Sequence, residues 1–218
     1  YSIVTVTTEN KEIQTLIKNK YKHISDEFSN LDKEIRSNYI GSAIGLKKMM
    51  GKYDCHHTIT YHNSIQKSKD FAKILEEVLD KDIYITHIDG SMSMKQRKKI
   101  FREFEKKGKG IICAAQVMNE GVNIPIIDSE AFIDPRSSTI DIVQCIGRAL
   151  RKYKNKKMSR IFVPIFVDSL EEEFDDSKYG NVIKILKSMG TQDDSIIEYF
   201  KLKKENVVSK EKSSKIIH

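Results

Sequence analysis

Strand-like and helix-like segments alternate regularly between residues 55 and 167. Short runs rich in β-branched and aromatic residues are separated by helix-length segments whose apolar residues recur every three or four positions. Such alternation is typical of a mostly parallel sheet covered by helices on both faces, because parallel neighbours are joined by helical crossovers. We therefore predict an α/β fold. Strands are expected at 58–62, 83–88, 110–115, 130–133 and 160–167, and helices at 64–80, 93–107 and about 140–151.

The flanking segments are less regular. A short strand is expected at 1–7, followed by one or two surface helices within 9–36, where apolar residues recur at helical spacing. The segment 41–53 superficially resembles a phosphate-binding loop, but Gly45 and Gly51 enclose five residues rather than four, and Tyr53 stands where Ser or Thr is required. It predicts a helix stopped by a glycine instead. Two further helices are expected near 181–189 and 195–204, before a basic tail.

Composition narrows the class of protein. A chain of 218 residues with 39% hydrophobic content can bury a proper core, and its net charge of +7 favours polyanionic partners. The cysteines Cys55, Cys113 and Cys145 are odd in number and widely spaced, which indicates a reducing, intracellular compartment (cytoplasmic, nucleoid or nuclear). No apolar run approaches the roughly 18 residues of a membrane span, and no signal peptide is recognisable. Because an initiator Met is also missing, we expect a fragment of a longer protein.

The segment 144–151 reads Gln-Cys-Ile-Gly-Arg-Ala-Leu-Arg and follows good helix-capping residues. In a helix, Gln144, Arg148 and Arg151 share one arc, while the opposite arc is apolar. Gly147 costs such a helix about 1 kcal/mol relative to Ala, which suggests that something approaches its backbone closely. By itself the pattern fits a solvated cationic face equally well. The apolar arc is expected to contain Ile142, Val143, Ile146, Ala149 and Leu150.

Three segments in this order resemble the second RecA-like domain of superfamily 2 (DEAD/DEAH-like) helicases and translocases. Residues 58–64 (TITYHNS) resemble motif IV, residues 112–125 (ICAAQVMNEGVNIP) resemble motif V, and residues 144–151 resemble motif VI. The joint occurrence is far more specific than any single motif. The resemblance covers roughly residues 55–167 and implies a three-layer RecA-like domain.

The resemblance also implies half of an ATPase site. In this family, ATP and Mg²⁺ lie between two RecA-like domains, and the first domain supplies a phosphate loop and an acidic box that this sequence lacks. The implied partner is therefore an N-terminal RecA-like domain of the same polypeptide. Arg151 is the expected arginine finger, Arg148 shares its role, and Gln144 contacts the phosphate or the attacking water. The expected nucleotide-contacting residues are Gly121, Asn123, Glu120 and Gly147.

DNA or RNA is the other partner that the resemblance implies, at loops following the strands. Ala115 departs from the family, in which Thr is common there, and Gln116 replaces a frequent Asp. We therefore expect phosphate contacts from backbone amides at this point. The expected nucleic-acid-binding residues are Asn63, Ser64, Gly90, Ser91, Ala115 and Gln116.

The helix at 93–107 carries a basic face that we expect to be merely solvated, because a helix flank need not face the nucleic acid. Arg97 lies within its apolar stripe and is expected in a structural ion pair. The stripe is Met94, Ile100, Phe101 and Phe104, opposite Lys95, Lys98, Lys99, Arg102 and Lys106. A second basic cluster, at 152–157, fits either a phosphate contact or a soluble turn.

No metal site is expected at Cys55, His56 and His57, even with His62 nearby. Alternation along a strand sends adjacent side chains to opposite faces, and no second cysteine pair exists to complete a zinc site.

Taken together, the motifs predict the second motor domain of an ATP-dependent helicase, inactive as an isolated chain. We divide the chain into a strand and helical segment at 1–54, packed on or inserted into the motor domain, the RecA-like domain at 55–168, and a helical appendage with a basic tail at 169–218. The alternatives are a duplex translocase of a restriction or remodelling enzyme, and an inert RecA-like binding module. Intact Arg148 and Arg151 disfavour the inert module, which would have no need of both.

Overall fold

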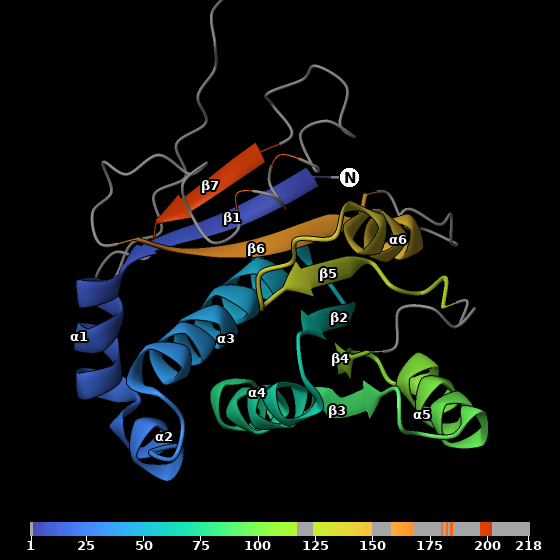
Figure 1. Ribbon diagram of the computed structural model, residues 1–218, viewed down its shortest axis with the longest axis horizontal. Coiled ribbons are helices and arrows are strands. Elements are labelled where there is room, and N and C mark those ends of the chain that lie inside the picture. The colour runs from blue at the N-terminus through green and yellow to red at the C-terminus, as the bar shows by residue number, and fades with distance from the viewer. Residues whose placement is uncertain are drawn as a thin grey trace, which may run out of the picture.

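A computed structural model describes residues 2–116, 124–149, 158–167, 180, 182, 184 and 197–201, with the backbone alone for 2–10, 148, 149, 167 and 197–201. The described strands form one seven-stranded sheet of order β3-β4-β2-β5-β6-β1-β7, and every pairing in it is parallel (Figure 1). The strands are β1 (Ser2–Glu9), β2 (His57–His62), β3 (Tyr84–Asp89), β4 (Gly110–Ala115), β5 (Ser129–Phe132), β6 (Arg160–Val167) and β7 (Ile197–Lys201).

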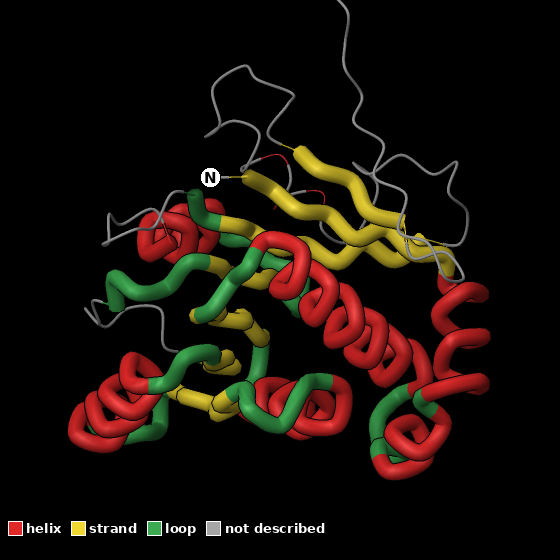
Figure 2. The backbone as a smooth tube through the Cα atoms, turned by 180° about the vertical axis from the view of Figure 1, so that it is seen from behind, coloured by secondary structure: helices red, strands yellow, loops and turns green. Residues whose placement is uncertain are grey.

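Helices cover both faces of this sheet, as the sequence predicted. Four helices, α1 to α4, lie on one face, while α5 and α6 lie on the other (Figures 1 and 2). The predicted three-layer α/β fold is confirmed. The helices are α1 (Asn10–Lys20), α2 (Lys22–Glu27), α3 (Lys33–Tyr53), α4 (Ile65–Val78), α5 (Met94–Lys106) and α6 (Thr139–Ala149).

Two hydrophobic clusters, one on each face, hold the layers together. Side chains alternate along β4, so that Ile111 and Cys113 join the cluster under α3 and α4, whereas Ile112 and Ala114 join the cluster under α5 and α6. All four are buried. This explains why the strands read as continuous apolar runs, since both faces of a parallel sheet are covered.

The helix α3 is longer than the sequence indicated. A stop at Gly51 was predicted, but the helix continues through this residue to Tyr53, and Asp54 adopts the left-handed conformation at its end with φ of 52°. Asp tolerates this conformation because its short polar side chain can hydrogen-bond locally. The prediction of a glycine stop was therefore wrong.

The C-terminal part of the described chain also differs from expectation. A helix was predicted over 195–204, but Ile197–Lys201 forms the edge strand β7, paired in parallel with β1. The segment reads Ile-Glu-Tyr-Phe-Lys, and its β-branched and aromatic residues suit a strand. The strand conformation of this segment depends on its pairing with β1. Because β1 lies far away in the sequence, local residue spacing could not reveal this pairing. The helix predicted near 181–189 falls almost entirely outside the described residues.

Candidate functional site

The predicted nucleic-acid-binding residues follow three adjacent strands. Asp89 at the end of β3 is paired with Ala115 at the end of β4, and Ala115 is paired with His62 at the end of β2. The loops that begin at Gly90, Gln116 and Asn63 therefore leave the same edge of the sheet. Ligands of open α/β sheets bind at this carboxyl edge. The tertiary structure thus brings these predicted residues together.

Gly90 and Gln116 touch through the backbone. A Cβ atom at Gly90 would lie 2.8 Å from the Gln116 carbonyl oxygen, and Gln116 has a positive φ of 58°. Neither loop could approach the other so closely with a side chain at position 90. Both residues are exposed, whereas Ala115 is buried. With only 1% of the residue exposed, Ala115 offers a ligand almost no surface, from either its side chain or its backbone.

Ser91 fixes its own loop. Its backbone amide and its hydroxyl donate to Asp89 Oδ1 over 2.8 and 2.5 Å, respectively, and His87 Nε2 lies 3.6 Å from Asp89 Oδ2. Burial by itself raises the pKa of Asp89, but the Ser91 hydrogen bonds and the nearby His87 and Lys69 outweigh burial and lower it. An ionised Asp89 therefore holds the loop after β3 in shape.

Asn63 and Ser64 also have structural partners. The Asn63 side-chain amide donates to the Pro135 carbonyl oxygen over 3.0 Å. The Ser64 hydroxyl caps α4 by accepting a hydrogen bond from the Lys67 amide over 3.2 Å. The two side chains predicted to bind nucleic acid in this loop thus form hydrogen bonds that stabilise the connection between β2 and α4.

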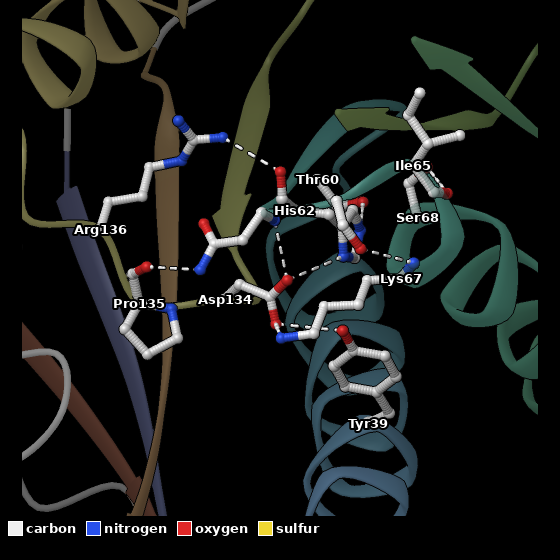
Figure 3. A network of polar contacts seen from close by, with 11 residues as sticks. Tyr39, Thr60, His62, Ile65, Lys67, Ser68, Asp134, Pro135 and Arg136 are labelled. Atoms are coloured by element: carbon white, nitrogen blue, oxygen red, sulfur yellow. Dashed lines mark hydrogen bonds and ion pairs between the residues drawn. The ribbon is translucent and has the colours of Figure 1, made fainter. Parts of the chain in front are cut away.

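A buried carboxylate, Asp134, organises this part of the edge (Figure 3). It accepts hydrogen bonds from the Tyr39 hydroxyl of α3 over 3.0 Å and from the Asn63 backbone amide over 2.9 Å. Lys67 of α4 places its ammonium 3.8 Å from the same carboxylate. Two segments far apart in the sequence, α3 and residues 63–67, are therefore tied to the charge of Asp134.

His62 is the neutral member of this network. Its Nε2 lies 2.8 Å from Thr60 Oγ1, and its Nδ1 lies 3.9 Å from Asp134 Oδ2. Burial lowers the pKa of His62 to about 3, with further contributions from the positive charges of Arg136 and Lys67. The imidazole is uncharged at neutral pH and cannot neutralise Asp134.

Sequence reasoning overlooked Arg136 and Asp134. The Arg136 Nη2 donates to the His62 carbonyl oxygen over a long 3.4 Å, and its guanidinium lies over the Tyr61 ring with 5.4 Å to the centroid. Its buried Nε has no hydrogen-bond partner within the described part of the chain. The signal was available, because the charged residues Asp134 and Arg136 directly follow the predicted strand 130–133, at the carboxyl edge of the sheet.

The helix α6 carries the motif with the two arginines. Ile142, Cys145 and Ile146 are buried, while Gln144 and Gly147 are exposed. Ser138 Oγ caps the helix by accepting from the Asp141 amide over 3.3 Å. These features agree with the predicted helix and its buried arc.

Two expectations for α6 need correction or remain open. Val143 was predicted to be in the apolar arc but is 40% exposed, so the buried surface of α6 is narrower than the sequence pattern suggested. A Cβ atom at Gly147 would meet nothing within 4 Å, so the described chain supplies no group that approaches this glycine. The Arg148 side chain and all of Glu120, Gly121, Asn123 and Arg151 lie outside what is described, as does the cluster 152–157.

On α5, Arg97 is buried within the apolar stripe as its position predicted, and its Nε donates to the Met92 carbonyl oxygen over 3.0 Å, while the structural ion pair expected for it stays a prediction. Met94, predicted to be in the apolar stripe, is instead 45% exposed, because it lies in the first turn at the margin of the buried face.

The histidines considered as metal ligands have other contacts. His57 Nε2 lies 3.2 and 3.0 Å from the Phe104 and Lys107 carbonyl oxygens at the end of α5. In the described ranges no three His, Cys, Asp or Glu side chains are grouped so that they could hold a metal ion. Within the same ranges no helix has the length and apolar character needed to cross a membrane.

Comparison with known proteins gives a family match. The model of the family described as helicase conserved C-terminal domain matches residues 42–153. A probable helicase of African swine fever virus is 26% identical over 132 residues, which are 60% of this chain and 15% of the relative. The ATP-dependent RNA helicase HAS1 of Saccharomyces cerevisiae is 27% identical over 105 residues, 48% of this chain and 20% of the relative. The chain thus spans a small part of these relatives.

Solved structures show the same fold. An ATP-dependent Type ISP restriction-modification enzyme, LlaBIII bound to DNA, aligns with a TM-score of 0.70 at 21% identity over 90% of this chain and 14% of that one. Domain 2 of a DEAD-box helicase bound to an RNA duplex aligns with a TM-score of 0.54 at 16% identity, covering 77% and 56%. At these identities the likeness concerns the fold.

Proposed function

This chain belongs to the helicase conserved C-terminal domain family, and from that premise we propose that it is the second motor domain of an ATP-dependent nucleic-acid helicase. ATP and Mg²⁺ would be held mainly by a first RecA-like domain of the same polypeptide. That domain would present the phosphates to α6 and to the segment 120–123. The proposal concerns the whole protein, because this chain corresponds to only 15% and 20% of two curated helicases that it matches.

The observation that supports this proposal best is the arrangement of α6. Three buried residues, Ile142, Cys145 and Ile146, anchor the helix on the sheet, while Gln144 and Gly147 face outward. Among the described residues, nothing lies within 4 Å of the position that a Cβ atom at Gly147 would take. A phosphate or a neighbouring domain could therefore approach the helix backbone at this glycine.

Charge chemistry assigns the roles of the motif residues. Phosphoryl transfer spreads negative charge over the γ-phosphate oxygens, and a guanidinium offers fixed, paired donors to such oxygens. We assign the arginine finger to Arg151, a supporting role to Arg148, and contact with the phosphate or attacking water to Gln144. Gly121, Asn123 and Glu120 would contact the nucleotide or couple it to the nucleic-acid track. Mg²⁺, when bound, neutralises charge that develops on the phosphates.

The proposed nucleic-acid track is the carboxyl edge formed by β3, β4 and β2. The Ser91, Asn63 and Ser64 side chains already have partners within the chain. We therefore assign phosphate binding there chiefly to exposed backbone amides and to the Gln116 side chain. Backbone amides at loops and helix N-termini commonly donate hydrogen bonds to phosphate oxygens.

The test is Arg151→Ala in the full-length protein, with ATPase turnover measured on single-stranded DNA, RNA and duplex. We expect turnover to fall by about 10³-fold or more, with nearly unchanged nucleic-acid affinity. Arg36→Ala is a matched control, because it removes a guanidinium from α3 on the opposite face. Unchanged turnover in Arg151→Ala would contradict the finger assignment. A strand-separation assay on the same samples distinguishes unwinding from translocation along duplex.

A further inference from the structure

Four basic residues follow one line along α5. Lys95, Lys99, Arg102 and Lys106 are separated by four, three and four positions, and at 100° per residue they fall within an arc of about 60°. All four are exposed. On the opposite side of the helix, Arg97, Phe101 and Phe104 are buried. We call these four residues the α5 stripe; it faces away from the sheet.

The charges of the α5 stripe are not neutralised within the described structure. None of its residues forms an ion pair there. The acidic residues of the helix, Glu103 and Glu105, lie about 80° to either side of the stripe, and Glu103 interacts with the Tyr84 hydroxyl.

Unrelieved repulsion of this kind has an energetic cost. Like charges four positions apart destabilise a helix. Lys95 with Lys99 and Arg102 with Lys106 are such pairs. A polyanion laid along the α5 stripe would relieve this repulsion.

The α5 stripe adjoins the proposed nucleic-acid track. The helix begins directly after the loop of Gly90 and Ser91, where the Ser93/Gln96 capping box fixes its first turn. Lys95 lies in that first turn, next to the edge where Gly90 contacts Gln116. From Lys95 to Lys106 the stripe extends about 16 Å, which matches about five phosphates of one strand at 3.4 Å each.

We propose that the α5 stripe is a second phosphate-binding surface, which holds the nucleic-acid backbone beyond the strand-edge loops. The inference rests on the proposed function, because it extends the same track. It also revises the expectation that this helix face is merely solvated, since sequence alone could not show that the charges are unpaired and adjoin the loops. The bonds would be charge-assisted and independent of base sequence.

Binding of the 218-residue chain to labelled oligonucleotides tests this proposal. Fluorescence anisotropy would be recorded with single-stranded and duplex probes between about 50 and 200 mM salt, a range in which phosphate contacts change affinity strongly. One variant combines Lys95→Gln, Lys99→Gln, Arg102→Gln and Lys106→Gln. The control removes equal charge from the opposite face with Lys11→Gln, Lys18→Gln, Lys22→Gln and Lys33→Gln, all at exposed positions.

We expect the stripe variant to bind at least about tenfold more weakly and its plot of log affinity against log salt to flatten by about 3, whereas the control changes little. Comparison of the two probes shows whether single strand or duplex follows the stripe. Thermal unfolding of all variants verifies that each is folded, and loss of repulsion should leave the stripe variant at least as stable as the wild type.

Three outcomes would overturn the proposal in distinguishable ways. Equal weakening of the stripe and control variants would contradict the α5 stripe alone and leave the strand-edge track intact. A wild-type chain that binds neither probe would contradict both the stripe and the nucleic-acid part of the proposed function. If the chain bound poly-glutamate as well, and the stripe variant weakened that binding as much as it weakens oligonucleotide binding, the assignment of the α5 stripe to nucleic acid would be contradicted.

Discussion

At the scale of single residues, two exposed glycines at the candidate site differ in what surrounds them. A Cβ atom at Gly90 would lie 2.8 Å from a backbone oxygen, whereas one at Gly147 would meet nothing within 4 Å. The chain itself therefore requires the glycine at position 90. At position 147 the described residues leave room for alanine, so they impose no requirement for glycine there.

This difference gives a prediction for Gly147→Ala. The isolated chain should become more stable by up to about 1 kcal/mol in urea unfolding, because alanine favours the helix over glycine. ATPase turnover of the full-length protein should fall, because the new methyl group occupies the approach to α6. Gly51→Ala in α3, where the space is equally open, should give similar stabilisation without loss of turnover. If Gly147→Ala left turnover unchanged, close approach at this glycine would be excluded.

At the scale of secondary-structure elements, Asp134 connects α3 and α4 to the loop after β5. Tyr39 of α3 donates to its carboxylate over 3.0 Å across 95 residues of sequence, and Asn63 donates over 2.9 Å from the loop after β2. The carboxylate is buried. The position of the loop before α6 is therefore coupled to a helix that lies outside the three family motifs.

Tyr39→Phe tests this coupling. The variant removes a hydrogen bond to a charged group and should lower the free energy of unfolding by about 1.5–3 kcal/mol. A double-mutant cycle with Asp134→Asn should show non-additive effects of at least about 0.5 kcal/mol. Tyr21→Phe is the control, because the half-buried Tyr21 hydroxyl makes no hydrogen bond in the described structure. Additive effects of Tyr39→Phe and Asp134→Asn would mean that the two side chains do not act as a pair.

At the scale of the whole molecule, the buried imidazole of His62 links unfolding to pH. Its pKa is about 3 in the folded chain, compared with an ordinary value of 6.5, so the unfolded chain binds a proton first as pH falls. The stabilisation is fully present above pH 6.5 and is lost progressively as pH falls toward 3. Protonation therefore favours the unfolded state throughout this window.

The expected size can be measured by urea unfolding at pH 7 and pH 5. His62 alone should lower the free energy of unfolding by about 2 kcal/mol between these pH values, because each unit below 6.5 contributes about 1.4 kcal/mol. His62→Gln should remove this part of the pH dependence. A remainder is expected from His57 and His87, whose pKa values are also lowered by burial. An identical pH dependence in His62→Gln would refute the assignment.

The parallel sheet also limits what local pattern can reveal about the molecule as a whole. The strand β1 lies between β6 and β7 in the sheet, although β1 is the first described strand in the sequence and β6 and β7 are the last two. At Gly41, a Cβ atom would lie 2.8 Å from the Ile13 side chain of α1 and 3.0 Å from the Phe166 side chain of β6. The segment before residue 55 is thus closely packed against the strand that ends the regular alternation.

The sequence alone determined the features that depend on neighbours along the chain. Strands β2 to β6, helices α4 to α6 and the Ser93/Gln96 capping box follow from residue periodicity and local hydrogen bonding, and the family follows from three short motifs. Only the tertiary structure decided the edge strand β7, the exposure of Val143 and Met94, and the network around Asp134, because each depends on partners distant in sequence. The roles of Arg148 and Arg151 stay predictions, because the Arg148 side chain and all of Arg151 lie outside the described residues and the phosphates that they would contact are not part of this chain.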